Sequence, residues 1–361
     1  MNRKVIALTI HSLQAGGMEN VMAKLANYFS ITYDADIHLV IFGKSSEIFY
    51  EINSKVIIHK PIKRFIERPR FIGTISRVFY LRRNILAIDP SSVLSFGVPW
   101  NSFVLLALLG TKYPVFISDR GSPQRQYSKL SELMRKLFYR YAKGIIAQTD
   151  VAAEMLKRIF PHPNIKVIGN PVEILPNHHK EKENIILSVG RLIATKHHDR
   201  LISIFSRLNA PGWKLVIVGG DALKERNETR LRKIIEENGL SDRVIIAGEV
   251  KNVREYYLKS RIFAFTSSVE GFPNVIAEAL SAGLPVVSYD CVAGPSEMII
   301  DGKNGYLVPV FKDDLFLAKL QILVKDNLVL KSLSGNATKL VRRFYINNIG
   351  KEFYSFILDE N

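Results

Sequence analysis

A chain of 361 residues is long enough to form two domains of ordinary size, each with its own hydrophobic core. Its 47% hydrophobic and 23% charged residues exclude an intrinsically disordered protein, and its single cysteine, Cys291, excludes an internal disulfide framework. The longest apolar run, residues 103–109, is far shorter than the roughly 20 residues of a membrane-spanning helix. We therefore expect a globular protein in a reducing cytoplasm that does not cross a membrane.

The net charge of +16 is concentrated in the first half of the chain. Residues 1–170 hold 24 Lys and Arg against 11 Asp and Glu, a balance of +13, whereas residues 171–361 hold 26 against 23, a balance of +3. Solubility alone does not explain this asymmetry, so we expect the first half to face an acidic partner. Nucleic acid and the anionic face of a membrane both fit this requirement.

The first half alternates short apolar strands with helices, which predicts a parallel, doubly wound sheet. It opens with a strand at Lys4–Ile10, the loop SLQAGGMEN and a helix from Met18 to Phe29, which is the start of a Rossmann-like unit without the G-x-G-x-x-G fingerprint. Gly16 and Gly17 would let the backbone approach a ligand closely, although most glycine pairs only form turns. Further strands are expected at 37–42, 55–58, 93–96, 115–118 and 144–148, and further helices at 101–109, 129–142 and 151–159.

A basic segment runs from Lys60 to Arg83, and its cations alternate with apolar residues. Residues 71–87 have helical spacing with a mixed apolar and basic surface, which is typical of a segment that lies on anionic lipid. A packed helix with a solvated basic face explains the same pattern, and the sequence does not decide between the two. Only Glu67 opposes the eight cations, which are Lys60, Lys63, Arg64, Arg68, Arg70, Arg77, Arg82 and Arg83.

The second half repeats the alternation of strands and helices after a polar stretch. Residues 167–184 contain two prolines and are the expected linker between two domains. The segment that follows Phe311 is expected to be largely helical. Strands are expected at 185–189, 214–218, 243–247, 261–265, 284–288 and 305–308, and helices at 198–208, 226–238, 253–259 and 274–282.

Four charged residues of the second half lie near expected strand ends or a helix start. Arg191 and Lys196 follow the strand 185–189, and two cations that act from different directions suit a diphosphate. Glu270 lies in the loop before the helix that carries Glu278, and the N-terminus of such a helix offers N–H groups to an anion. Together the four residues suit a ligand with negative charge and hydroxyl groups, such as a nucleotide sugar. Each pattern alone is also common as solvated surface.

The segments EGFPNVIAEAL, AGLPVVSYD and GPSE between residues 270 and 297 closely resemble the donor-site signature of the family-4 retaining glycosyltransferases. The resemblance extends from Gly16 to about Val310 and is greatest with the branch that builds bacterial surface polysaccharides and lipid-linked oligosaccharides. It implies an α/β fold of the GT-B type, with two Rossmann-like domains whose parallel sheets face each other across a cleft. Residues 1–170 would form the acceptor-binding domain and residues 171–361 the donor-binding domain, with C-terminal helices that pack back toward the first.

The resemblance also implies roles for individual residues. Arg191 and Lys196 would bind the donor diphosphate and stabilise the leaving nucleotide. Glu270 would contact the transferred sugar, and Glu278 would accept hydrogen bonds from the ribose hydroxyls. Backbone groups of other residues would complete the donor site: Phe272, Asn274 and Val275 at the distal phosphate, Gly248 and Val250 near the base, and Gly16 and Gly17 against the diphosphate.

On the acceptor side the resemblance is weaker. Glu19, in the loop that contains Gly16 and Gly17, would lie near the acceptor. The family often has a histidine after the strand equivalent to 115–118, but here the loop reads Ser-Asp-Arg-Gly, and Arg120 is expected to take that place.

The resemblance implies a retaining transferase that moves a hexose or N-acetylhexosamine from a nucleotide sugar to a saccharide acceptor. With the basic first half, it also suggests an acceptor on a polyprenyl diphosphate. A uridine donor is expected, and GDP-mannose is the second choice. No metal or other cofactor is expected, because the chain has no D-x-D motif and the adjacent His197 and His198 do not form a metal site. The helix dipole and the two cations would stabilise the leaving group instead.

The basic first half then predicts peripheral attachment to the inner, anionic face of the cell membrane. Nucleic-acid binding is the alternative that the charge suggests, but the sequence contains no recognised nucleic-acid-binding module. A nucleotide-sugar-modifying enzyme, such as an epimerase on the same fold, is a second alternative. It would require an acid–base pair near the sugar, which the sequence does not display.

Overall fold

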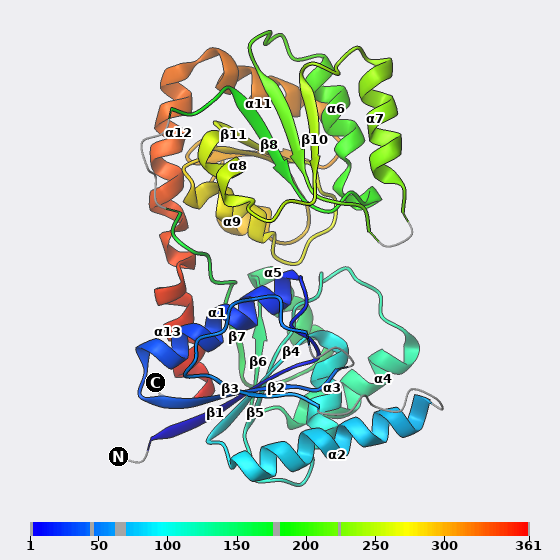
Figure 1. Cartoon of the computed structure of the whole chain (residues 1–361), viewed down its shortest axis with the longest axis vertical. Helices are drawn as coiled ribbons and strands as arrows, with labels where there is room; N and C mark the ends of the chain where they lie inside the picture. The colour runs from blue at the N-terminus through cyan, green and yellow to red at the C-terminus, as the bar shows by residue number, and fades with distance from the viewer. Residues whose placement is uncertain (1–2, 44–46, 62–69, 176–180, 223–224, 360–361) are drawn as a thin grey trace. The chain divides into compact units, whose positions relative to one another are not determined.

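The computed structural model describes residues 3–43, 47–61, 70–175, 181–222 and 225–359 and divides the chain into two compact units (Figure 1). Unit 1 comprises residues 1–171 and 346–361, and unit 2 comprises residues 172–345. The last helix, α13 (Ile346–Ile357), therefore belongs to unit 1, although the expected boundary at 170/171 assigned it to the second domain.

Unit 1 is built on a seven-stranded parallel sheet in the order β3-β2-β1-β4-β5-β6-β7. Its central strands are almost fully buried because helices cover both faces, which explains why they read as continuous apolar runs. The strands are β1 (Lys4–Ile10), β2 (Ala35–Ile41), β3 (Ile57–His59), β4 (Ser92–Phe96), β5 (Val115–Ser118), β6 (Gly144–Ala147) and β7 (Ile165–Val167).

The helices of unit 1 lie on both faces of this sheet (Figure 1). They are α1 (Gly17–Thr32), α2 (Arg70–Ile88), α3 (Val98–Ala107), α4 (Lys129–Phe138), α5 (Asp150–Ile159) and α13. Helix α13 packs against α1, where the rings of Tyr33 and Tyr354 are stacked with centroids 3.6 Å apart. A Cβ atom on Gly350 would lie 2.3 Å from the ring of Tyr28, so only glycine permits this close packing. The predicted return of the C-terminus to the first domain is thus confirmed for α13.

Unit 2 is built on a six-stranded parallel sheet in the order β10-β9-β8-β11-β12-β13. Both sheets are doubly wound and parallel, as predicted. The strands are β8 (Ile185–Val189), β9 (Lys214–Val218), β10 (Val244–Gly248), β11 (Ile262–Phe265), β12 (Val286–Asp290) and β13 (Gly305–Pro309). The helices are α6 (His198–Ser206), α7 (Asn227–Glu237), α8 (Arg254–Lys259), α9 (Asn274–Ser281), α10 (Pro295–Met298), α11 (Asp313–Lys325) and α12 (Asn327–Leu340).

The strand orders identify where each sheet can bind a ligand. In unit 1, β1 lies between β2 and β4, and in unit 2, β8 lies between β9 and β11. From each of these first strands the chain builds the sheet in one direction and then returns to extend it in the other. Ligands of open α/β sheets bind outside the carboxyl ends of the strands at this switch point. The point lies between β1 and β4 in unit 1 and between β8 and β11 in unit 2. Over the described residues, no helix combines the length and apolar character that crossing a bilayer requires.

Candidate functional site

The residues predicted for the donor diphosphate and sugar follow the two strands at the switch point of unit 2. Strand β8 leads through Gly190 into a short 3-10 turn (Ala194–Lys196), and β11 leads into the loop that contains Glu270. Because β8 and β11 are hydrogen-bonded neighbours, both loops emerge at the same edge of the sheet. The structure therefore brings Lys196 and Glu270 together although 74 positions separate them.

Lys196 and Glu270 form an ion pair in which Nζ contacts Oε1. The two side chains are only 16% and 12% exposed. The Lys196 ammonium lies 5.0 Å from the centroid of the Phe265 ring, and its alkyl chain lies over Gly190, where an added Cβ would be 3.5 Å from Cε. The ammonium group is therefore held at the end of β8, close to the carboxylate and largely shielded from water.

Hydrogen bonds tie the two loops together around this pair. Thr266 Oγ1 donates to the carbonyl oxygen of Lys196 at 2.9 Å, and the Ser268 N–H donates to the Thr195 carbonyl at 3.0 Å. His197, which has a left-handed backbone (φ 50°), places Nε2 2.8 Å from Ser268 Oγ. These contacts fix Lys196 relative to the loop that carries Glu270.

Glycine at position 219 lets the ends of β8 and β9 approach. Gly219 has φ 150°, and a Cβ atom there would lie 1.9 Å from the carbonyl oxygen of Gly190. Its N–H donates to the Gly248 carbonyl at the end of β10, at 2.9 Å. Gly248, predicted near the base, also has a positive φ of 70°, and Val250 follows it in the loop. The loops after β8, β9 and β10 therefore depend on these two glycines.

Helix α9 begins at Asn274, as predicted, and carries Glu278 at the same edge of the sheet. Glu278 Oε2 accepts a hydrogen bond of 3.0 Å from the hydroxyl of Tyr257, which is 1% exposed on α8. Burial and then the nearby Glu278 charge raise the pKa of Tyr257 well above its ordinary value, so the phenol remains a donor at neutral pH. Tyr257 could not be predicted from the sequence, because nothing in its local pattern distinguishes it from any other buried tyrosine.

The separate parts of the sequence signature also meet in space. Gly294, from the segment GPSE, has φ 104°, and an added Cβ would lie 2.2 Å from Pro273 Cδ. Phe272 is 8% exposed and packs edge-on against Phe344 at 5.5 Å between ring centroids. This packing fixes the backbone that leads into Asn274 and Val275. Arg191, by contrast, exposes its side chain.

In unit 1, the loop of Gly16 and Gly17 follows β1 at the switch point of the first sheet. The Tyr50 hydroxyl accepts from the Gly16 N–H at 2.8 Å and donates to the Gly16 carbonyl at 2.7 Å. The Glu19 carboxylate folds back onto Gly16, where an added Cβ would lie 2.2 Å from Oε2, and burial raises the pKa of Glu19. Tyr50 thus fixes the position of this loop, a role that no local sequence pattern indicates.

Arg120 lies at the end of β5, but its guanidinium is already bound within unit 1. Nε donates to Ser118 Oγ at 2.8 Å, Nη1 contacts Asn170 Oδ1, and the guanidinium carbon lies 4.1 Å from the centroid of the Phe96 ring. Burial lowers the pKa of Arg120 to about 9. Arg120 therefore connects β5 to Asn170, and a contact between Arg120 and the acceptor stays a prediction.

Part of the basic segment lies outside the described residues. Lys63, Arg64 and Arg68 fall within residues 62–69, whereas α2 supplies Arg77, Arg82 and Arg83. Helix α2 is therefore the described part of the segment from which its packing and exposure can be read.

Both units of the chain are similar to known glycosyltransferases. Residues 15–174 match the model of Glycosyltransferase Family 4, and residues 172–340 match that of Glycosyl transferases group 1. An amylovoran biosynthesis glycosyltransferase of Erwinia amylovora is 28% identical over 92% of this chain and 93% of its own. A Campylobacter jejuni enzyme, N-acetylgalactosamine-N,N'-diacetylbacillosaminyl-diphospho-undecaprenol 4-alpha-N-acetylgalactosaminyltransferase, is 28% identical over 98% of this chain and 99% of its own.

A solved structure shows the same fold over the whole chain. Anabaena HepE in complex with UDP superimposes with a TM-score of 0.79 at 17% identity and covers 98% of each chain. Together, the two family models span both units, and the relatives match from end to end. The chain therefore belongs to the family-4 glycosyltransferases of the GT-B fold.

Proposed function

We propose that the protein transfers a hexose or N-acetylhexosamine from a UDP-linked donor to a saccharide carried on a lipid diphosphate, with retention of configuration. One observation carries the proposal: the shielded Lys196–Glu270 pair lies at the switch point of unit 2, at the edge where α9 brings Glu278. An ion pair buried this far adds little net stability, because desolvation offsets the attraction. The arrangement therefore favours ligand binding over a structural purpose.

In the proposed reaction, Arg191, Lys196 and the N-terminus of α9 bind the donor diphosphate, and the two glutamates bind hydroxyl groups. The bond between the anomeric carbon and the diphosphate oxygen breaks, and the acceptor oxygen bonds to that carbon on the same face. The acceptor proton passes to the departing phosphate. The cations stabilise the negative charge that develops on the leaving group, so we expect activity without a metal.

The named relatives support the finer parts of the proposal. HepE binds UDP, and the Campylobacter relative acts on a saccharide linked to diphospho-undecaprenol. Residues 1–171, the larger part of unit 1, carry most of the excess positive charge, which suits a diphosphate lipid in an anionic membrane. Membership of the family favours sugar transfer over the epimerase-like and nucleic-acid-binding alternatives.

The donor half of the proposal is tested by nucleotide binding to Tyr257→Phe. Loss of the hydroxyl removes the hydrogen bond that orients Glu278, and a hydrogen bond to a charged group contributes about 1.5–3 kcal/mol. We expect the Kd of Tyr257→Phe for UDP, measured by calorimetry, to be about tenfold or more above that of wild type.

The uridine preference is tested on the wild-type protein with the same method. We expect wild type to bind GDP at least about tenfold more weakly than UDP.

The adjacent Tyr256→Phe is the matched control, because the Tyr256 hydroxyl forms no hydrogen bond within the described chain. Equal UDP affinities for wild type and Tyr257→Phe would rule out the proposed role of Glu278. Equal affinities for UDP and GDP would rule out the uridine preference.

Helix α2 is the proposed membrane-docking surface. Its Leu81 and Ile85 are fully buried in unit 1, whereas Ile75, Phe79 and Leu86 on the opposite face are 50%, 67% and 50% exposed. Arg83 is exposed on the same face. A packed helix with only a solvated basic face would not expose these large apolar side chains, so their exposure beside a cation supports interfacial binding.

Flotation with vesicles that contain phosphatidylglycerol tests this surface with the variant Ile75→Asp/Phe79→Asp. Burial of one large apolar side chain contributes about 1.5–3 kcal/mol, so the double variant should bind at least about tenfold less than wild type. Leu328→Asp, at a position 81% exposed on α12 of unit 2, is the control and should float like wild type. Unchanged flotation of the double variant would exclude α2 as the docking surface.

A further inference from the structure

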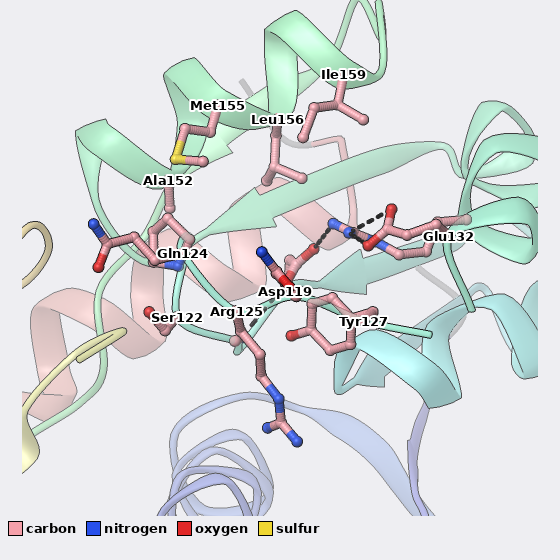
Figure 2. A pocket seen from close by; sticks show the side chains of 14 residues that line it. Asp119, Ser122, Gln124, Arg125, Tyr127, Glu132, Ala152, Met155, Leu156 and Ile159 are labelled. Carbon is pink, nitrogen blue, oxygen red and sulfur yellow. Dashed lines mark hydrogen bonds and ion pairs between the residues drawn. The ribbon is translucent and has the colours of Figure 1, made fainter. Parts of the chain in front are cut away.

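A groove between α4 and α5 in unit 1 contains none of the residues assigned above (Figure 2). It consists of two hollows of about 460 Å³ and about 240 Å³, and Ile159 lines both. The larger hollow lies at the carboxyl ends of β5 and β6, because Asp119 follows β5 and α5 follows β6. Parallel sheets bind ligands at this edge.

The two acidic side chains that line the larger hollow share one buried arginine. Arg135, which is 6% exposed, donates through Nη2 to Asp119 Oδ2 at 3.1 Å and through Nη1 to Glu132 Oε1 at 3.0 Å. Two polar groups that line the hollow, Arg135 Nε and Ser122 Oγ, are buried and have no hydrogen-bond partner among the described residues. Buried polar groups are ordinarily hydrogen-bonded, so these two suit a polar ligand.

One wall of the groove is apolar. Ala152, Met155, Leu156 and Ile159 recur on one face of α5, and Figure 2 shows them projecting toward the loop of residues 119–127. Across from this wall, the loop supplies the amide groups of Gln124 and Gln126 together with the hydroxyl groups of Ser122 and Tyr127.

The smaller hollow is cationic. Lys136 on α4 and Arg140 in the following turn line it, with His162 and the apolar Ile159 and Phe160. Arg140 donates to the Tyr141 hydroxyl at 2.9 Å, but within the described chain neither cation forms an ion pair with a carboxylate. The groove thus offers unneutralised positive charge beside a continuous apolar wall.

We propose that this groove binds the lipid-diphosphate end of the acceptor, an inference that rests on the proposed function. The phosphates bind Lys136 and Arg140, and the first part of the lipid chain lies along the apolar wall of α5. A free anion would not need the apolar wall, and a purely apolar ligand would not need the cations.

The lipid has an exposed route away from the groove. Leu130, Leu133 and Leu137 lie on one face of α4 and are 68%, 52% and 43% exposed. Lys136 follows Leu133 and precedes Leu137, so the cationic hollow lies on the same helix as these apolar side chains. A lipid chain that passed along them would remain in contact with apolar surface.

The probe is farnesyl diphosphate, a short polyprenyl diphosphate, titrated calorimetrically into the full-length protein with saturating UDP to block the donor site. We expect farnesyl diphosphate to bind at least about tenfold more tightly than either farnesol or inorganic diphosphate. Farnesol lacks the diphosphate that would contact the cations, and inorganic diphosphate lacks the isoprenoid chain that would contact the apolar wall. Lys136→Ala/Arg140→Ala should raise the Kd by about tenfold or more. Met155→Glu should also weaken the binding of farnesyl diphosphate, because it places a carboxylate in the apolar wall of α5.

Lys157→Ala/Arg158→Ala is the matched control, because it removes two exposed cations of α5 that line neither hollow. Its affinity should equal that of wild type. The inference would be overturned if inorganic diphosphate or farnesol bound as tightly as farnesyl diphosphate. It would also be overturned if Lys136→Ala/Arg140→Ala bound farnesyl diphosphate with the affinity of wild type. UDP affinity, measured on the same protein preparations, reports whether unit 2 is folded and tests the proposed function separately. If the protein binds UDP but not farnesyl diphosphate, only the inference about the groove is wrong.

Discussion

Lys196→Ala is expected to lower kcat/KM for the sugar donor by about a hundredfold to a thousandfold. Removal of one group that stabilises developing negative charge in an enclosed site costs about 2.7–4 kcal/mol in the transition state. In this chain the loss is aggravated because the Glu270 carboxylate, 12% exposed, is left without the cation that pairs with it. The rate of UDP release from a UDP-sugar in the presence of acceptor measures the effect.

Lys214→Ala is the control for this variant, because Lys214 is an exposed lysine of unit 2 at the amino end of β9, away from the proposed donor site. Its kcat/KM should equal that of wild type. Thermal unfolding of both variants distinguishes lost chemistry from lost folding. If Lys196→Ala retained more than about a tenth of wild-type kcat/KM, its loss of transition-state stabilisation would be below 1.4 kcal/mol, and Lys196 would not be the counter-charge of the leaving group.

Gly219→Ala is expected to destabilise unit 2 by more than about 2 kcal/mol, which corresponds to a fall of about 5 °C or more in its Tm. Its φ of 150° is unfavourable for any residue with a Cβ, and the Cβ itself would lie 1.9 Å from the Gly190 carbonyl oxygen. The clash is with backbone, so the loop from Gly190 to Lys196 must move, and donor binding should fall as well.

Gly212→Ala is the matched control in the same unit. A Cβ there would have only Asn184 Nδ2 as a neighbour, at 4.0 Å, so the Tm should stay within about 2 °C of the wild-type value. Differential scanning calorimetry compares the two variants. Equal Tm values for Gly219→Ala and wild type would contradict the close approach of β8 and β9.

Most of the candidate donor site could be placed on its loops and helix from the sequence, because its residues belong to short segments that follow strands. The motif placed Glu270 in a loop and Glu278 on the next helix, and α9 begins at the predicted Asn274. The spacing could not show that β8 and β11 are neighbours, because strand order is a property of the whole sheet. The family resemblance implied two Rossmann-like domains, and the order of their strands comes from the structure.

The supporting residues could not be predicted in the same way. Tyr257 and Tyr50 act through hydrogen bonds to residues 21 and 34 positions away, and only tertiary packing creates these contacts. Strand β7 is three residues long and includes Lys166, so it lacks the apolar run that predicts a strand and was assigned in part to the linker. Helix α3 begins three residues earlier than expected, because Pro99 is accommodated in its first turn.

The groove between α4 and α5 was also beyond sequence analysis. Helical periodicity predicted both helices, but it did not show that the Asp119–Arg135 pair would form the floor of a hollow. Asp119 follows β5 and Arg135 lies on α4, and only tertiary packing shows that the two side chains pair.

The central claim is tested most directly by a transfer assay with the wild-type protein. Radiolabelled UDP-hexoses and UDP-N-acetylhexosamines are incubated one at a time with saccharides on a polyprenyl diphosphate, and the label is followed into the lipid fraction. We predict that one donor transfers its sugar to the lipid-linked saccharide with retained anomeric configuration, in the presence of EDTA, and that Lys196→Ala slows this transfer by about a hundredfold or more. Label that stays in the nucleotide fraction for every donor, or that returns there as an epimerised nucleotide sugar, would contradict the account.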